Sequence, residues 1–311
     1  MKIAFVFPGQ GSQSVGMLDA WEGNTAVEQT LQQASQALGQ DLAALVAQGP
    51  TEALNLTTNT QPVMLAAAVA VYAAWRDAGG AQPALVAGHS LGEYSALAAA
   101  GAIALDDAVR IVRVRADAMQ AAVPVGTGAM AAVLGLSDDD VRAVCAQAAG
   151  PQTVEAVNFN APAQVVIAGH KEAVERACEL AKEKGAKRAL LLPVSAPFHS
   201  SLLKPAADVL ESALNDIDIK APAIPVINNV DVAIAGEPAA IRDALVRQAW
   251  HPVRWVETVQ AMKAQGVTHV IECGPGKVLN GLTKRIDKDL TGLAITDPAS
   301  LQAALELVRE A

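Results

Sequence analysis

Residues 88–92 read Gly-His-Ser-Leu-Gly, a pattern that can hold a serine hydroxyl ready for nucleophilic attack. A short apolar run at 84–87 precedes the pattern, and an Ala/Leu-rich segment with helical character follows it. The turn between such a strand and helix is so tight that Gly88 and Gly92 must both lack a Cβ. Ser90 would then project above the sheet, with the next backbone N–H directed to where an oxyanion forms. The pattern therefore predicts a nucleophile elbow.

An alternative role for Ser90 is to cap the following helix. Residues 90–93 read Ser-Leu-Gly-Glu, which is also a capping box. In that case the Ser90 hydroxyl accepts a hydrogen bond from the backbone three residues on and is poorly placed to attack anything. A capping box needs neither Gly88 nor Gly92, so the two glycines favour the elbow.

An elbow serine needs a base, because a free hydroxyl is a weak nucleophile at neutral pH. The chain has five histidines. His199 is the favoured base, because it follows a predicted strand and precedes a predicted helix, on a loop that can face a cleft. His251, which precedes Pro252, stays an alternative. The other three histidines are expected to have other roles. His89 should point away from the serine, His170 should begin a helix, and His269 should lie in an apolar strand.

Arg115 interrupts an apolar helix face. On the helix predicted from Asp106, positions 108, 111, 112, 115 and 119 form one stripe, and all but Arg115 are apolar. A guanidinium buried in this way needs an anion or another polar partner. An internal ion pair or a side chain that reaches solvent would satisfy Arg115. A substrate carboxylate held by two parallel hydrogen bonds would satisfy it equally well.

Composition narrows the class of protein. The 311 residues are 52% hydrophobic and 18% charged, which suits one large domain, or one domain with a smaller insertion. The net charge is −9 and no basic cluster is dense enough to follow a phosphate backbone, so we expect no nucleic-acid partner.

The cysteines and apolar segments predict a cytoplasmic protein. Cys145, Cys178 and Cys273 have neither disulfide nor zinc spacing, so we expect reduced thiols and no metal site. The apolar N-terminus is too short for a signal peptide. The longest apolar run, 62–75, falls short of a membrane span and predicts a core helix.

Alternating strand and helix signals predict an α/β fold. We first expect strands at 2–7 and 84–87 and helices at 61–78, 91–100 and 106–121. After a hinge at 124–128 the order becomes β-α-β-β-α-β, at 129–134, 138–149, 153–157, 164–168, 172–184 and 188–192. A proline-rich stretch at 193–197 closes this unit, and α/β alternation resumes with strands at 225–227 and 267–272. The order predicts a large parallel-sheet, α/β-hydrolase-like catalytic domain (1–124 and 196–311) with an inserted ferredoxin-like subdomain (125–195).

Five motifs together identify a family. They are Pro-Gly-Gln-Gly-Ser-Gln at 8–13, the elbow at 88–94, Pro-Phe-His-Ser at 197–200, Gln248 with Pro-Val-Arg-Trp at 252–255, and Glu-Cys-Gly-Pro-Gly-Lys at 272–277. In this order and spacing they resemble the malonyl-CoA:acyl-carrier-protein transacylases, the acyltransferases of fatty-acid synthesis. The resemblance covers essentially the whole chain.

The resemblance implies a ping-pong mechanism. Ser90 would attack the thioester of malonyl-CoA while His199 removes its proton, and coenzyme A would leave. The phosphopantetheine thiol of acyl carrier protein would then take the malonyl group. Malonyl-CoA and the carrier protein are thus the implied partners, with no cofactor, because the coenzyme A thioester is itself a substrate. The backbone N–H groups of Gln10 and Leu91 would form the oxyanion hole.

Further roles also follow from the resemblance. Gln248 corresponds to the residue that orients the histidine through its carbonyl, which departs from the Ser-His-Asp pattern. The sequence alone does not exclude Asp231 or Asp243 as the acid. Arg115 matches the arginine that grips the malonyl carboxylate. Gln61 and Asn160 occupy family positions near the cleft.

Other functions stay open at this stage. They are a standalone acyltransferase of a polyketide pathway, a serine esterase or thioesterase, and a binding protein that keeps the fold without the activity. Because carrier proteins are usually acidic, docking would need a local basic patch. Candidates are Lys182, Lys184, Lys187 and Arg188, or Lys284, Arg285 and Lys288, although each cluster could equally be a solvated helix face.

Overall fold

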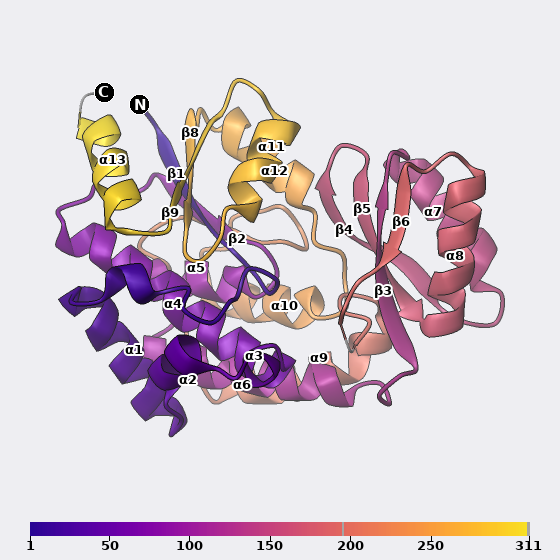
Figure 1. The fold of residues 1–311 in the computed structure, drawn as a ribbon, viewed down its shortest axis with the longest axis horizontal. Helices are drawn as coiled ribbons and strands as arrows, with labels where there is room; N and C mark the ends of the chain where they lie inside the picture. The colour runs from indigo at the N-terminus through magenta and orange to yellow at the C-terminus, as the bar shows by residue number, and fades with distance from the viewer. Residues whose placement is uncertain (195, 310–311) are drawn as a thin grey trace.

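Two β-sheets organise the chain. A computed structural model describes residues 1–194 and 196–309. Figure 1 shows a larger part built on a five-stranded sheet and, beside it, a smaller part built on a four-stranded sheet. The predicted nucleophile and base, Ser90 and His199, lie on loops at the boundary between the two parts.

The larger sheet is parallel throughout the described residues. Its strand order is β7-β2-β1-β8-β9, and every neighbouring pair runs in the same direction. The strands are β1 (Ile3–Phe7), β2 (Leu85–Gly88), β7 (Val226–Ile227), β8 (His269–Cys273) and β9 (Thr291–Ile295). All five residues of β1 are buried, as expected for a strand with helices on both faces.

Alternate residues of β1 pack into two different cores. Ile3, Phe5 and Phe7 join the core formed with α1 (Thr25–Leu38), α4 (Thr57–Asp77), α5 (Gly92–Ala99), α6 (Leu105–Ala121) and α9 (Lys204–Asn215). Ala4 and Val6 join the core formed with α11 (Trp255–Ala264) and α12 (Val278–Ile286). The remaining helices of this part are α2 (Leu42–Gln48), α3 (Thr51–Leu54), α10 (Pro238–Gln248) and α13 (Pro298–Arg309), with short 3₁₀ turns at Asp19–Trp21 and Ser201–Leu203.

The smaller sheet is antiparallel and has its own core. Its order is β4-β5-β3-β6, from β3 (Gly128–Leu134), β4 (Val154–Ala161), β5 (Gln164–His170) and β6 (Arg188–Leu191). The helices α7 (Asp138–Ala149) and α8 (Lys171–Glu183) pack on one face, where they bury a separate apolar cluster. The element order is β-α-β-β-α-β, as predicted.

Most predicted elements are present with shifted ends. Helix α4 begins at Thr57, before the predicted start at 61, because Thr60 Oγ1 donates hydrogen bonds to the Leu54 and Leu56 carbonyls and stabilises a turn of low helix propensity. Strand β4 runs on to Ala161 through two register shifts. Sequence patterns did not predict α1 to α3, α13 or the edge strand β9, whose pattern Thr-Gly-Leu-Ala-Ile is only weakly strand-like.

Parallel pairing brings the functional loops together. Phe7 pairs with Gly88, so the loops that follow β1 and β2 begin side by side at the carboxyl ends of both strands. The approach is close, since a Cβ on Gly9 would lie 2.7 Å from the His89 carbonyl oxygen. Strand β7 pairs with β2 on its other side, which places the loop after Ile227 against the same turn.

We expect Gly88→Ala to lower the free energy of unfolding by about 3 kcal/mol. The new Cβ would lie 1.8 Å from the Gly92 carbonyl oxygen, and this backbone atom cannot move without opening the elbow. The matched control is Gly281→Ala on α12, where nothing lies within 4 Å of the added methyl group. That change should leave stability within about 1 kcal/mol of wild type. Urea denaturation midpoints would measure both, and equal midpoints for the two variants would contradict the prediction.

Candidate active site

Ser90 lies on the turn between β2 and α5 and does not cap the helix. Its φ is 53°, a strained value for a residue other than glycine, as a nucleophile elbow requires. The capping alternative is wrong, because the N-cap position of α5 is Leu91 and no side chain caps the helix. The Ser90 Oγ lies instead 2.6 Å from His199 Nε2 and 3.0 Å from Arg115 Nη2.

The His199 imidazole is held in one tautomer. Its Nδ1 lies 2.8 Å from the main-chain carbonyl oxygen of Gln248. A carbonyl can only accept a hydrogen bond, so Nδ1 carries the proton and Nε2 is left to accept the Ser90 hydroxyl proton. His199 also has a positive φ of 64°, so both members of the pair hold unusual backbone conformations.

The Gln248 carbonyl is available because of its place in the fold. Gln248 is the last residue of α10, where the final carbonyls have no intrahelical donor and the helix dipole is negative. Burial lowers the pKa of His199 to about 3, and the nearby positive charge of Arg115 adds to this effect, whereas the bond to the Gln248 carbonyl opposes it. The resting imidazole is therefore a neutral base.

Arg115 is buried, with 1% of its surface exposed, and its hydrogen-bond partners are neutral. Nη1 donates to Gln61 Oε1 at 2.7 Å, and Nη2 donates to Gln248 Oε1 at 3.0 Å as well as to Ser90 Oγ. The Nε atom has no partner in the described part of the chain. No ion pair among the described residues includes Arg115, so its charge has no bonded carboxylate. The site can therefore accept an anion beside the serine.

A pocket of about 130 Å³ surrounds these groups. It lies between the two parts of the molecule, since residues of both line it: Gln10, Gln61, Ser90, Leu91, Arg115 and His199 from the larger part, and Met130 and Asn158 from the smaller one. The backbone N–H groups of Gln10 and Leu91 have no hydrogen-bond acceptor among the described residues. Two donors are thus free on the pocket wall.

Of the two residues expected near the cleft, Gln61 lines the pocket and Asn160 does not. Gln61 contacts Arg115 inside the pocket, and its Nε2 approaches Met119 Sδ at 3.8 Å. Asn160 Oδ1 instead lies 2.8 Å from His89 Nε2 and is not part of the pocket lining. Asn158, two residues earlier on β4, does line the pocket, and its buried Oδ1 has no partner in the described structure. No sequence pattern indicated Asn158, because the predicted strand ended at residue 157 and β4 continues past it through two register shifts.

The alternative base and acids take part in other contacts. His251 Nδ1 lies 2.8 Å from the Arg247 carbonyl oxygen. Asp231 and Asp243 both bind the Arg247 guanidinium, at 2.7 Å each. The acid position that the sequence left open is therefore occupied by the Gln248 carbonyl, and neither aspartate binds His199.

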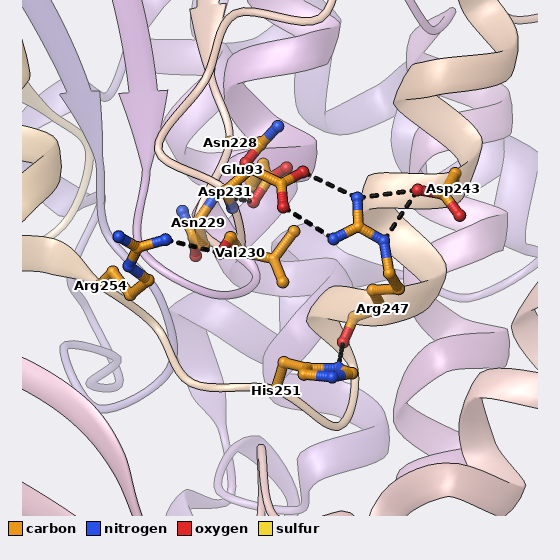
Figure 2. A network of polar contacts seen from close by, with 9 residues as sticks. All are labelled: Glu93, Asn228, Asn229, Val230, Asp231, Asp243, Arg247, His251 and Arg254. Carbon is orange, nitrogen blue, oxygen red and sulfur yellow. Dashed lines mark hydrogen bonds and ion pairs between the residues drawn. The ribbon is translucent and has the colours of Figure 1, made fainter.

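Glu93 and Asn229 also lie against the elbow, although no sequence pattern marked them as site residues. Glu93, on the first turn of α5, is buried, and burial raises its pKa to about 7. Its Oε2 accepts hydrogen bonds from the Asn229 backbone N–H and from Gln248 Nε2, both at 3.0 Å. Figure 2 shows Glu93 and the Asn229 loop together with the charged network that adjoins them.

Larger hollows lie outside this pocket. One of about 960 Å³ is formed by α7, α8 and β6 and is not lined by Ser90, His199 or Arg115. Another, of about 610 Å³, reaches His199 from the side of Trp250 and Arg142. Within the described ranges no cluster of histidine, cysteine and acidic side chains could hold a metal ion, and no helix is long and apolar enough to cross a bilayer.

Comparisons with known proteins agree on one family. Residues 4–291 match the model of the acyl transferase domain. The chain is 58% identical over 307 residues to the malonyl CoA-acyl carrier protein transacylase of Escherichia coli K12, covering 98% of this chain and 99% of that protein. The solved acyl-carrier-protein S-malonyltransferase of Burkholderia pseudomallei is 69% identical with a TM-score of 0.97, covering 98% and 100% of the two chains.

A further solved structure shows a malonyl-transacylase in complex with a type II polyketide-synthase acyl-carrier protein. The chain is 54% identical to the matched chain of that structure, with a TM-score of 0.97. The match covers 99% of this chain and 100% of the matched chain.

We expect the His199 imidazole to stay neutral between about pH 5 and pH 8, where an ordinary histidine titrates. Burial and the Arg115 charge both lower the pKa of His199, so a proton binds only in stronger acid. NMR of protein labelled at histidine ¹³Cε1, assigned with His199→Asn, would follow the signal. The unfolded protein in urea provides the ordinary titration for comparison. A folded-state midpoint near that of the unfolded chain would refute the prediction.

Proposed function

The chain belongs to the acyl transferase domain family, and we propose that it transfers the malonyl group of malonyl-CoA to acyl carrier protein for fatty-acid synthesis. The observation that carries the proposal is the contact of Ser90 Oγ with both His199 Nε2 and the buried Arg115 guanidinium. Such a site offers a nucleophile and a fixed positive charge within the length of a malonyl group. The activity is that of an acyl-carrier-protein S-malonyltransferase.

In the first half-reaction Ser90 Oγ attacks the thioester carbonyl carbon while its proton passes to His199 Nε2. The negative charge that develops on the carbonyl oxygen would be bound by the Gln10 and Leu91 backbone N–H groups, which have no other acceptor among the described residues. Collapse of the intermediate breaks the C–S bond. The coenzyme A thiolate leaves with the His199 proton, and malonyl-Ser90 remains.

In the second half-reaction the phosphopantetheine thiol of the carrier protein gives its proton to His199 and attacks malonyl-Ser90. Collapse then returns the proton to Ser90 Oγ and releases the malonyl thioester of the carrier. The two half-reactions exchange the acyl group between a thiol sulfur and Ser90 Oγ in opposite directions, so the same base and oxyanion donors serve both. We propose no cofactor for this cycle, since coenzyme A enters as part of a substrate.

Gln248 takes the place of the acid in a Ser-His-Asp triad. Its carbonyl carries only a partial negative charge, but it stands at the C-terminal end of α10, where the dipole adds to it. The carbonyl can therefore orient His199 and stabilise the imidazolium that forms in each step. A full carboxylate there would also attract Arg115, which the reaction needs free for the substrate.

Arg115 would bind the malonyl carboxylate. The carboxylate of malonate lies one CH₂ group from the carbonyl that Ser90 attacks, and Arg115 Nη2 is 3.0 Å from Ser90 Oγ. An acetyl group would leave the buried charge with its neutral partners only, at a cost of about 2 kcal/mol. Gln61, which already binds Arg115, would hold the guanidinium at this angle, and Asn160 would act through His89.

Several finer assignments complete the proposal. The larger part is an α/β-hydrolase-like catalytic domain of residues 1–124 and 196–311, and the smaller is a ferredoxin-like subdomain of residues 125–195. Support comes from the parallel sheet that carries the elbow and from the β4-β5-β3-β6 order of the smaller sheet. A cytoplasmic location and the basic clusters as the carrier's docking surface stay predictions.

A second candidate is the same transfer to the carrier protein of a polyketide pathway. It is favoured only by the similarity to the malonyl-transacylase solved with a polyketide-synthase carrier. The chemistry at Ser90 is identical in the two cases. Relative turnover of the two kinds of holo carrier protein would separate them.

We expect the protein to gain the mass of one malonyl group when it is mixed with malonyl-CoA, and to lose it when holo carrier protein is added. The Ser90→Ala variant should gain nothing, because it lacks the oxygen that forms the ester. Intact-mass spectrometry measures both. Loss of the adduct to water at the same rate as to the carrier would instead indicate a thioesterase.

We expect Arg115→Ala to lower malonyl transfer by about 100-fold and to leave acetyl transfer unchanged or raised. The matched control is Arg110→Ala on the same helix, whose guanidinium binds Asp107 at the surface, away from the pocket. That variant should transfer both groups at the wild-type rate. Rates of Ser90 acylation from malonyl-CoA and acetyl-CoA would test this, and equal losses of both in Arg115→Ala would contradict the carboxylate assignment.

A further inference from the structure

Both backbone polar groups of Ser90 are held by side chains from distant segments. The Ser90 N–H donates to Asn229 Oδ1 at 2.7 Å, and Gln248 Nε2 donates to the Ser90 carbonyl at 2.8 Å. Ser90 itself has the strained φ of 53°. A strained residue keeps its conformation only where its surroundings fix it, so these two side chains are candidates for that task.

Asn229 spans the elbow with both ends of its amide. While Oδ1 accepts from Ser90, Nδ2 donates to the Gly88 carbonyl oxygen at 2.7 Å. The side chain thus joins the residue before the turn to the nucleophile. Asn229 is fully buried, so its loss would leave a donor and an acceptor of the elbow without partners or water.

Glu93 connects Asn229 to Gln248. Its Oε2 accepts from the Asn229 backbone N–H and from the Gln248 side chain. Gln248 in turn orients His199 through its carbonyl. The segment that holds the nucleophile and the segment that holds the base therefore meet at one buried carboxylate.

The same two segments meet a second time at the surface. Asp231, two residues after Asn229, forms a bidentate ion pair with Arg247, the residue before Gln248, with distances of 2.8 Å and 2.7 Å. Figure 2 shows this pair bridging the Asn229 loop and the end of α10, with Arg254 donating to the Val230 carbonyl on the other side of the loop.

The loop needs such an anchor. Val232, the residue after Asp231, has a φ of 57°, which is costly for a β-branched side chain. Without the ion pair the loop could relax at Val232 and carry Asn229 away from the elbow. The side chains of Asp231 and Arg247 are 41% and 33% exposed, so we expect little direct effect of the pair on the free energy of unfolding.

We propose that Asn229 is a positioning residue for the nucleophile, and that the Asp231–Arg247 ion pair holds the Asn229 and Gln248 segments at the spacing that the Ser90–His199 hydrogen bond requires. The proposal rests on the proposed function, in which Ser90 is the nucleophile. It assigns to a surface ion pair an effect on rate that exceeds its effect on stability. A misplacement of about 1 Å between reacting groups can slow a reaction about 100-fold.

The first test compares Asp231→Asn with Asp243→Asn. Both variants remove one carboxylate from the same Arg247 guanidinium, but Asp243 lies on α10 itself, four residues before Arg247, and joins no second segment. We expect Asp231→Asn to lower the rate of Ser90 acylation at saturating malonyl-CoA about tenfold, with an unchanged half-saturating concentration. The Asp243→Asn rate should stay within about twofold of wild type.

The second test removes the elbow contact directly. Asn229→Ala should lower the same rate about 100-fold. Labelling of Ser90 by a small phosphonofluoridate, which carries no carboxylate and does not need Arg115, should slow in parallel in both the Asn229 and Asp231 variants. A purely structural role would lower the melting temperature without moving this labelling rate in the folded protein.

The outcomes distinguish a failure of the proposed function from a failure of the positioning role. If wild-type protein forms no malonyl-serine, the proposed function fails. If wild type is acylated, three results would overturn only the positioning role: equal rates for Asp231→Asn and Asp243→Asn, wild-type labelling in folded Asn229→Ala, or a raised half-saturating concentration at an unchanged maximal rate. If Asn229→Ala does not fold, the aspartate comparison still decides.

Discussion

The hydrogen bond from His199 Nδ1 to the Gln248 carbonyl is the constraint on which the site depends. It fixes the tautomer, because a carbonyl cannot donate, and so it leaves Nε2 facing the Ser90 hydroxyl. It also ties His199 to the end of α10, whose dipole would support the imidazolium in the proposed transfer. Through the Gln248 side chain the same residue reaches the Ser90 carbonyl and Glu93, so one glutamine couples the base to the nucleophile.

Arg115 sets the electrostatics of this pocket, and its effects act in different directions. Its positive charge adds to burial in lowering the pKa of His199, which keeps the resting base neutral. The Arg115 guanidinium also donates a hydrogen bond to Ser90 Oγ, and its charge would stabilise this oxygen as the hydroxyl loses its proton. A bound carboxylate would offset this charge and allow the imidazolium to form more easily. In the proposed function the malonyl carboxylate would thus complete the charge balance at the site, which would couple substrate specificity to rate.

Backbone strain is concentrated around the proposed reaction site. Among the described residues other than glycine, positive φ angles occur at Ser90, His199, Val232 and Ala163. The first two are the proposed nucleophile and base, and Val232 lies in the loop that carries Asn229. Such conformations persist only where surrounding contacts fix them. At Ser90, Asn229 and Gln248 supply such contacts from buried positions, while Gly92 allows the close approach of β1 to α5 and Gly88 that of β2.

The sequence by itself determined the parts that depend on local pattern. The spacing of Gly88, Ser90 and Gly92 predicted the elbow, helical periodicity predicted a buried Arg115, and the alternation of elements predicted a smaller unit within a parallel-sheet fold. Only the tertiary structure decided which distant residues contact the elbow and its neighbouring loop. Ser90 and Asn229 are 139 positions apart and meet because β7 pairs with β2, while Asp231 finds Arg247 because α10 ends beside that loop. Local periodicity determines which face of an element is buried, but strand order and helix packing determine its neighbours, and no short-range pattern encodes them.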